Sequence, residues 1–299
     1  MPKSVPDFIV IGAMKAGTTS LYADLKARLG VFLPERKELN LLNNYPSASL
    51  SSITAKYRKY YNGCGDGRVA GEISTQYTKY PSYNLTPYTA SKLFPKHTKI
   101  VYMVRCPLER LRSQHHHEFP HGQTPANIGE AIMLDHRLVA YSSYYLQLTR
   151  WLDYFPASNV SVLPFERYVQ QRSAVLSDLL SFIGADNKDI AGRAPIENVS
   201  AERVVYNDVA AWFARSLFYR ERIRPLLDDR KIQVLKRAMS SKGPATERPE
   251  IGANVEVLAN RLLASDLSKF LSLIGAASYD EVATNARFNF VRLGEVGDN

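Results

Sequence analysis

The chain has 299 residues, a length that suits one large α/β domain or two small ones. Hydrophobic residues make up 45% and charged residues 22%, which is ordinary for a globular protein whose core requires neither a disulfide framework nor a structural metal. The formal net charge of +9 favours anionic partners, a class that includes phosphate or sulfate groups, acidic glycans, nucleic acid and membrane surfaces.

The cysteines and the N-terminus indicate a cytoplasmic protein. Cys64 and Cys106 are too few for a disulfide framework, and we expect no bridge between them, which suits a reducing cytosol. The start, MPKSVPDFIVIGAMKAG, lacks a cationic stretch followed by a sustained apolar run, so no signal peptide is expected. No run of about 18 to 20 apolar residues occurs, so no membrane span is expected either.

Strand and helix signals alternate through the first half of the chain, a pattern typical of βαβ units and a parallel sheet. The short apolar run 8–11, closed by Gly12, predicts a buried strand. Residues 18–29 predict a helix because a leucine recurs at every fourth position. Gly30 is expected to end this helix in a left-handed conformation.

Two further strands are expected at 69–74 and 99–104, and the second holds three consecutive β-branched or aromatic residues. Pro107 is expected to open the next helix, where its missing N–H costs no hydrogen bond. Residues 127–155 predict a helical stretch with an apolar stripe, and a fourth strand is expected at 160–163. The stripe consists of Leu146, Leu148, Trp151 and Leu152.

The last part of the chain is expected to be mainly helical. A helix is predicted at 175–183, ended by Gly184, and a loop at 241–252, which is rich in Gly, Pro and charge. No internal repeat or interdomain linker is evident, so we expect one domain over residues 1–299. The predicted fold is an α/β three-layer sandwich, with a central parallel sheet flanked by helices and a helical C-terminal part.

The segment FIVIGAMKAGTTSLY, residues 8–22, joins a strand, a glycine-bearing loop and a helix N-terminus. In this order the exposed backbone N–H groups and the helix dipole face an anion. Lys15 adds a full positive charge, and three hydroxyl donors follow at Thr18, Thr19 and Ser20. The alternative is a solvated helix start that binds nothing.

This loop differs from that of a nucleoside triphosphatase, GxxxxGK[ST], in which Lys directly follows the second Gly. Gly12 and Gly17 have the required spacing, but Thr18 follows Gly17 and Lys15 lies two residues before it. No obvious Mg²⁺ ligand of the kind such enzymes use presents itself. The pattern therefore indicates a P-loop-like phosphate site with a relocated lysine.

Two segments, MKAGTT at 14–19 and VYMVRCPLERLRS at 101–113, carry phosphate signatures about ninety residues apart. They resemble the sulfotransferases that use 3'-phosphoadenosine 5'-phosphosulfate (PAPS), whose loop reads PK[SA]GTT. The resemblance implies that Arg105 and Ser113 bind the 3'-phosphate, although Cys106 stands where the family usually has Asp or Asn. It also implies that the 5'-phosphosulfate is bound by Lys15, Ala16, Gly17, Thr18, Thr19 and Ser20.

Within this family the chain is most similar to the glycosaminoglycan-type branch, which includes heparan sulfate sulfotransferases. RKELNLLNN resembles its KExHFFD segment, which implies that Glu38 is the catalytic base. GEISTQY resembles GEKSPxY, with Ile73 in place of a lysine that would face the active centre. SKGPATERPEI resembles the loop that closes over the nucleotide, which puts Lys242 and Gly243 near the 3'-phosphate. The likeness spans most of 7–275.

The resemblance implies a PAPS-binding core at about 7–185 and a cofactor-closing loop at about 240–252. Lys15 would neutralise the leaving phosphate, and Glu38 would take the proton of the acceptor, without any metal. The alternative is that Lys37 and Glu38 form only a charged pair at a loop surface. In that case the base would be Glu72 or one of the three consecutive histidines, His115, His116 and His117.

Those histidines resemble a metal tract, but no Cys or Asp ligand set accompanies them, so we expect no metal. One is expected to face the cofactor or acceptor cleft, while the others pack or meet solvent.

A set of basic residues in the C-terminal part is expected to form a solvated helix face, and no nucleic-acid partner is expected. This basic set consists of Arg215, Arg220, Arg222 and Arg224.

Three functions stay open from the sequence. The first is transfer of the sulfuryl group from PAPS to a hydroxyl, or less favourably an amine, of a carbohydrate or other polyhydroxylated acceptor. The second is tailoring of a small natural product or of a carrier-bound acyl chain. The third is non-catalytic nucleotide binding in a regulatory role. The acceptor and the oligomeric state are not predicted, since acceptor loops vary within a family.

Overall fold

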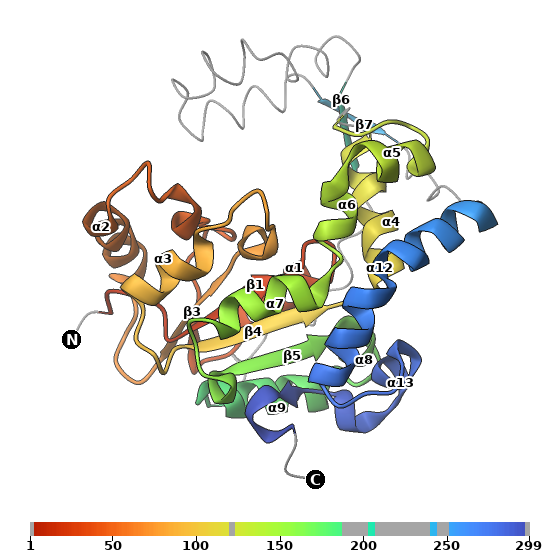
Figure 1. Ribbon diagram of the computed structural model, residues 1–299. Helices are drawn as coiled ribbons and strands as arrows, with labels where there is room; N and C mark the ends of the chain where they lie inside the picture. Colours follow the sequence, from red (N-terminus) through yellow and green to blue (C-terminus); the bar gives the residue numbers. More distant parts are fainter. Residues whose placement is uncertain (1–2, 120–122, 187–202, 207–239, 244–250, 297–299) are drawn as a thin grey trace.

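A six-stranded sheet crosses the centre of the molecule and is flanked by helices (Figure 1). The computed structural model describes residues 3–119, 123–186, 203–206, 240–243 and 251–296. Across the sheet, the strands are β2 (Val31–Phe32), β3 (Val69–Ile73), β1 (Phe8–Gly12), β4 (Lys99–Val104), β5 (Val160–Pro164) and β8 (Val291–Arg292).

The first five strands across the sheet are parallel, and β8 pairs with β5 in the antiparallel direction. Every residue of β1 and β5 is buried, as expected for strands that helices cover. The strands expected at 8–11, 69–74, 99–104 and 160–163 are confirmed within one residue at each end. The edge strands β2 and β8 were not predicted, because two residues carry no periodic pattern.

The helices of the described chain alternate with the strands up to β5 and then dominate (Figure 1). The N-terminal ones are α1 (Thr18–Lys26), α2 (Leu50–Tyr61), α3 (Thr86–Leu93), α4 (Pro107–Glu118), α5 (Ile128–Leu134), α6 (His136–Ala140) and α7 (Tyr144–Leu152). The later ones are α8 (Phe165–Gln170), α9 (Arg172–Ile183), α12 (Ala253–Leu273) and α13 (Tyr279–Thr284). The predicted flanked sheet, dominated by parallel strands, is thus confirmed, and α4 begins at Pro107 as expected.

The end of α1 differs from the prediction. The helix ends at Lys26, and Leu29 is 52% exposed rather than part of an apolar face. Gly30 is not among the glycines with positive φ, so it is no left-handed cap. A Cβ on Gly30 would lie 2.7 Å from the backbone nitrogen of Asp186, so the glycine is required by the close approach of another segment.

The helical stretch expected at 127–155 is divided into α5, α6 and α7. Two short polar side chains start new helices within it. Asn127 accepts hydrogen bonds from the first turn of α5, and Asp135 accepts one from the Arg137 N–H at 3.0 Å. In α7 only Leu148 and Trp151 of the expected stripe are buried.

Two glycine-containing segments near the end of the chain have different outcomes. Gly184 ends α9 with φ 73°, as predicted, although the helix starts at Arg172, three residues earlier than expected. The expected loop at 241–252 is wrong at its start, because β7 (Ser240–Gly243) pairs antiparallel with β6 (Arg203–Tyr206). The partner strand lies well before β7 in the sequence, so the β7 sequence alone does not reveal the pairing.

Some predictions fall on chain that the structure does not describe. Residues 244–250, the middle of the expected loop, and the basic set at 215–224 lie outside the described residues. The backbone of Lys242 pairs with Val204, and that of Gly243 pairs with Arg203. Their proposed contact with the 3'-phosphate stays a prediction.

Candidate active site

The site expected from the sequence lies where β1, β3 and β4 end. β1 lies between β3 and β4. From β1 the chain first forms β2 and β3 on one side of it, and then β4 and β5 on the other side. Such a switch point opens a crevice at the carboxyl ends of parallel strands, where ligands bind. Gly12, Ile73 and Val104 are the last residues of these three strands.

The phosphate loop runs from Gly12 to the start of α1. Its Ala13 N–H donates to the Met103 carbonyl of β4 at 2.5 Å, which fixes the loop to the sheet. Gly17 is the N-cap of α1 with φ 89°, and no side chain caps the helix. The first turn also carries no acidic residue. The helix therefore presents its N-terminal N–H groups and positive dipole end to a ligand anion.

Both glycines of this loop are needed for close packing. A Cβ on Gly17 would lie 2.5 Å from the ring of Phe165, at the start of α8. A Cβ on Gly12 would overlap the hydroxyl of Thr78, which donates to the Ile11 carbonyl at 3.2 Å. Two side chains that sequence analysis did not single out thus define the shape of the loop.

The predicted loop residues differ in their exposure. Ala16 and Thr18 are buried, Thr19 is exposed, and Lys15 and Ser20 are half-buried. Lys15 has φ 70°, a left-handed conformation that costs free energy in a residue with a side chain and is typical of functional loops. The lysine therefore lies in the turn before α1, and the three hydroxyl residues lie in the first turn of that helix.

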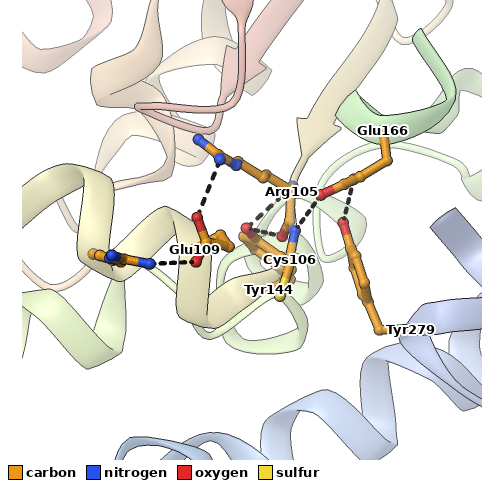
Figure 2. A network of polar contacts seen from close by, with 7 residues as sticks. Arg105, Cys106, Glu109, Tyr144, Glu166 and Tyr279 are labelled. Carbon is orange, nitrogen blue, oxygen red and sulfur yellow. Dashed lines mark hydrogen bonds and ion pairs between the residues drawn. The ribbon is translucent and has the colours of Figure 1, made fainter. Parts of the chain in front are cut away.

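Arg105 directly follows β4 and is held at both its backbone and its side chain (Figure 2). The Tyr144 hydroxyl donates to the Arg105 carbonyl at 2.6 Å. The guanidinium is paired with Glu109 at 3.3 Å and lies 5.2 Å from the centre of the Phe165 ring. Since Phe165 also packs on Gly17, one aromatic ring contacts both predicted phosphate sites. The two signatures, remote in sequence, are therefore adjacent in space.

Cys106 contributes its backbone rather than its thiol. Its N–H donates to one oxygen of the Glu166 carboxylate at 2.9 Å, and the other oxygen accepts from the Tyr279 hydroxyl at 3.0 Å (Figure 2). Burial raises the pKa of the Cys106 thiol, which disfavours its thiolate form. Both cysteines are free, as expected. Ser113 lies buried on α4, two turns beyond the start of that helix.

Glu38 lies beside the end of β3. Its N–H donates to the Ile73 carbonyl at 3.1 Å, and it has φ 60°. The carboxylate accepts from Lys37 at 2.7 Å and from the hydroxyl of Thr75 at 3.1 Å, and the side chain is 31% exposed. The pairing with Lys37 is therefore present, but Thr75 anchors the carboxylate at the crevice as well.

The short 3₁₀ turn η2 (Thr75–Thr78) connects the base candidate with the phosphate loop. Its first residue, Thr75, contacts Glu38, and its last residue, Thr78, contacts Gly12 and Ile11. Sequence reasoning missed both threonines, although their position directly after a buried strand could have indicated a role.

Glu72, the alternative base, is 1% exposed and fully engaged. It accepts hydrogen bonds from Tyr57 at 2.7 Å, Tyr77 at 2.5 Å and Ser74 at 2.6 Å. Burial raises the pKa of this carboxyl, while the hydroxyl donors oppose that effect. The Ser74 hydroxyl also accepts from the Asn40 N–H at 3.2 Å, so the cluster anchors the segment that carries Glu38.

The three histidines lie in different surroundings. His115 is buried, bonds the Pro125 carbonyl at 2.8 Å and stacks on Phe119. His116 is buried and His117 is exposed. Within the described chain, no group of three or more His, Cys, Asp or Glu side chains is arranged to hold a metal ion. None of its helices is long and apolar enough to cross a membrane.

Comparison with known proteins decides the family. Residues 5–211 match the model of the sulfotransferase domain, which is more than half of the chain. The chain belongs to the sulfotransferase-domain family. The family inferred from the sequence is therefore confirmed.

Two relatives of this sulfotransferase-domain chain are larger proteins. The membrane-associated sulfotransferase kil1 of Dictyostelium discoideum is 33% identical over 114 residues, 38% of this chain and 23% of that protein. The bifunctional heparan sulfate N-deacetylase/N-sulfotransferase of Drosophila melanogaster is 26% identical over 212 residues, 60% of this chain and 20% of that protein. This chain thus spans about a fifth of the length of such relatives.

A solved structure supports the fold over nearly the whole sulfotransferase-domain chain. The sulfotransferase from Alicyclobacillus acidocaldarius superimposes with a TM-score of 0.64 at 18% identity, covering 93% of this chain and 99% of that one. The predicted sandwich is the fold of that protein too.

Proposed function

We propose that this chain is a PAPS-dependent sulfotransferase that transfers the sulfuryl group to a hydroxyl of a carbohydrate or other polyhydroxylated acceptor. The observation that carries the proposal is the Phe165 ring, which packs on Gly17 of the phosphate loop and lies 5.2 Å from the Arg105 guanidinium. Two anion-binding elements that share one contact suit a nucleotide with phosphates at both its 3' and 5' positions. Family membership supports the same chemistry.

The donor would be held at its two ends. The uncapped N-terminus of α1 and the residues from Lys15 to Ser20 would bind the 5'-phosphosulfate. Arg105 would give the 3'-phosphate charge-assisted hydrogen bonds in addition to those of Ser113. Lys242 and Gly243, in a segment at about 240–252, would close over the nucleotide in a single domain with the core at about 7–185.

The transfer would be an in-line displacement at sulfur. The acceptor oxygen forms a bond to sulfur while the bond from sulfur to the phosphate oxygen breaks, releasing 3'-phosphoadenosine 5'-phosphate (PAP). Lys15 would neutralise the charge that develops on the leaving phosphate. Glu38 would take the proton of the acceptor hydroxyl, with its carboxylate oriented by Thr75.

A pocket beside Glu38 supports a hydroxyl-rich acceptor. It has a volume of about 560 Å³, and Leu39, the residue after the base candidate, is one of the residues that line it. Its lining offers amide, hydroxyl and cationic groups, which favour ligands with many donors and acceptors. Besides Leu39 and Leu41, the pocket is lined by amides, two tyrosines and cations: Arg36, Asn40, Asn43, Asn44, Lys56, Lys59, Tyr60, Gln76 and Tyr83.

The deciding experiment is incubation of the chain with sulfur-labelled PAPS and a panel of saccharides, natural products and carrier-bound acyl chains. Transfer of label to a saccharide is the expected result. Label on an acyl chain or a small natural product would contradict the carbohydrate assignment. Binding of PAP without any transfer would indicate a regulatory nucleotide-binding protein instead.

PAP is expected to raise the melting temperature of the chain, and ATP with Mg²⁺ to do so far less. A ligand present at about 100 times its Kd adds about 2.7 kcal/mol to the free energy of unfolding, which a thermal scan resolves. Only PAP has phosphates at both positions, so only it engages the α1 N-terminus and Arg105 together. Equal stabilisation by ATP and PAP, dependent on Mg²⁺, would contradict the donor assignment.

Replacing Arg105 by Ala is expected to weaken PAP binding about ten-fold or more, as for loss of one charge-assisted hydrogen bond. Adenosine 5'-phosphosulfate, which has no 3'-phosphate, should bind almost unchanged. Isothermal titration of both ligands measures the difference. Arg112→Ala is the matched control, because Arg112 also pairs with Glu109, at 3.4 Å. Equal weakening of both ligands in Arg105→Ala would show a structural role for Arg105.

A further inference from the structure

The backbone N–H groups of Arg105 and Cys106 are bonded to side chains from distant parts of the chain. The two residues lie between β4 and Pro107, the first residue of α4. The Tyr144 hydroxyl accepts from the Arg105 N–H at 3.2 Å and donates to the Arg105 carbonyl at 2.6 Å. The Glu166 carboxylate accepts from the Cys106 N–H at 2.9 Å. Long-range contacts therefore fix the peptide from which the Arg105 side chain extends.

Glu166 supplies a contact that a helix often makes for itself. Cys106 is the N-cap of α4, and the N–H of an N-cap residue is one of the donors that a helix leaves without a backbone partner. In a capping box, the third helical residue returns its side chain to that N–H. The third residue of α4 is Glu109, whose two oxygens pair with Arg105 at 3.3 Å and with Arg112 at 3.4 Å. Because Glu166 accepts from the N-cap, Glu109 can hold the Arg105 guanidinium.

The Glu166 carboxylate is held at both of its oxygens. The second oxygen accepts from the hydroxyl of Tyr279, on α13, at 3.0 Å. The residue before Glu166 is Phe165, whose ring lies 5.2 Å from the Arg105 guanidinium, so the first two residues of α8 contact the side chain and the backbone of one arginine. Figure 2 shows the guanidinium pointing away from Glu166 and toward Glu109. Glu166 thus acts on the backbone of this segment rather than on the guanidinium.

We propose that Glu166 is a positioning residue for the 3'-phosphate end of the donor and that it acts through Arg105. The inference rests on the proposed function, in which Arg105 binds the 3'-phosphate. Glu166 acts by the reach of its carboxylate, because the hydrogen bond to Cys106 fixes the Arg105 backbone and keeps Glu109 on the guanidinium. Its negative charge opposes binding, since the 3'-phosphate is an anion as well.

Two conservative variants separate the reach of Glu166 from its charge. Glu166→Asp keeps the charge but withdraws the carboxylate by one methylene, away from the Cys106 N–H. Glu166→Gln removes the charge but keeps the reach. Its amide oxygen can accept from Cys106, and its amide nitrogen can donate to the Tyr279 hydroxyl.

Isothermal titration of the full chain compares PAP with adenosine 5'-phosphate, which differs from PAP only in lacking the 3'-phosphate. Glu166→Asp should bind PAP about five-fold more weakly, as for the loss of one hydrogen bond, and adenosine 5'-phosphate as the wild-type chain does. Glu166→Gln should bind PAP at least as tightly as the wild-type chain. A residue with a merely structural role would not distinguish the two nucleotides.

Asp7→Ala is the matched control for a carboxylate that holds a distant backbone group. Asp7 accepts from the Ala70 N–H at 2.7 Å, but it directly precedes β1, at the edge of the sheet opposite the crevice. Its replacement removes the same kind of hydrogen bond and should change neither affinity.

Tyr279→Phe tests the proposal from another helix, and it does so even if Glu166→Asp fails to fold. It releases one oxygen of the Glu166 carboxylate, so it should weaken PAP binding about two-fold or more and leave adenosine 5'-phosphate unaffected. Tyr168→Phe is the control, because the Tyr168 hydroxyl also donates to a carboxylate, that of Asp24. It should alter neither affinity.

Three results would overturn the proposal. The first is unchanged PAP binding in Glu166→Asp. The second is equal weakening of both nucleotides in that variant, which identifies a general structural role. The third is a loss of PAP affinity in Glu166→Gln as large as in Glu166→Asp, which shows that the charge matters rather than the reach. The proposed function fails by a different result, a wild-type chain that binds PAP no more tightly than adenosine 5'-phosphate.

Discussion

Glu38→Gln is expected to lower turnover about 10² to 10⁴-fold while leaving PAP binding unchanged. Glutamine keeps the shape of the side chain and can still accept from Thr75, the contact that orients Glu38 at 3.1 Å. It cannot take a proton from an acceptor hydroxyl. The measurement compares kcat for transfer of labelled sulfur with the stabilisation by PAP, using the acceptor that the panel identifies.

Glu35→Gln is the matched control for this variant. Glu35 lies three residues earlier and pairs with Lys26 much as Glu38 pairs with Lys37, but its side chain is 90% exposed. Its replacement should leave both turnover and PAP binding unchanged. Near wild-type turnover in Glu38→Gln would move the base elsewhere, and it would leave the contact with Lys37 as the main role of Glu38. Glu72 is then a weak substitute, because three hydroxyls already occupy its carboxylate.

Lys15→Met is expected to lower turnover about 10² to 10³-fold. This is the effect typical of removing one preorganised group that stabilises the negative charge developing in the transition state. In contrast with Glu38→Gln, it should also weaken binding of PAP, since Lys15 lies in the phosphate loop with φ 70°. Methionine keeps the length and the apolar stem of the side chain. Single-turnover kinetics with saturating donor separates the loss in the transfer step from the loss in donor binding.

Lys26→Met provides the control at the other end of the same helix, where a lysine lies in the last turn of α1. It should change neither donor binding nor turnover. If Lys15→Met weakened PAP binding but transferred sulfur at the wild-type rate under saturation, Lys15 would bind the ground state only. Charge neutralisation would then come from the N-terminus of α1.

The strands and the phosphate loop could be predicted because their signals are local. An apolar run such as Lys99–Val104 has few alternatives to a buried strand, and the structure places β4 there. The loop between Gly12 and Thr18 is likewise encoded by adjacent residues. The same holds for Pro107 and Gly184, whose backbone restrictions mark a helix start and a helix end.

The remaining features depend on contacts between distant parts of the chain. Gly30 was mistaken for a helix cap because the approach of Asp186 cannot be inferred from its neighbours. Phe165 and Tyr144 position Arg105 across intervals of 60 and 39 residues, and neither belongs to a phosphate motif. Asn127 and Asp135 cap helices, but the sequence around them does not show that helices start there. The roles of these residues depend on long-range packing rather than on local propensity.

The turn η2 contacts both Glu38, the proposed proton acceptor, and the phosphate loop. In a 3₁₀ turn, side chains three residues apart project in the same direction, so Thr75 and Thr78 reach Glu38 and the Gly12 loop from one face. The rise between them is about 6 Å, at about 2 Å per residue. An insertion of one residue would add about 2 Å between the Thr75 contact and the Thr78 contact. The length of this turn is therefore expected to set the register between the proposed base and the phosphate loop.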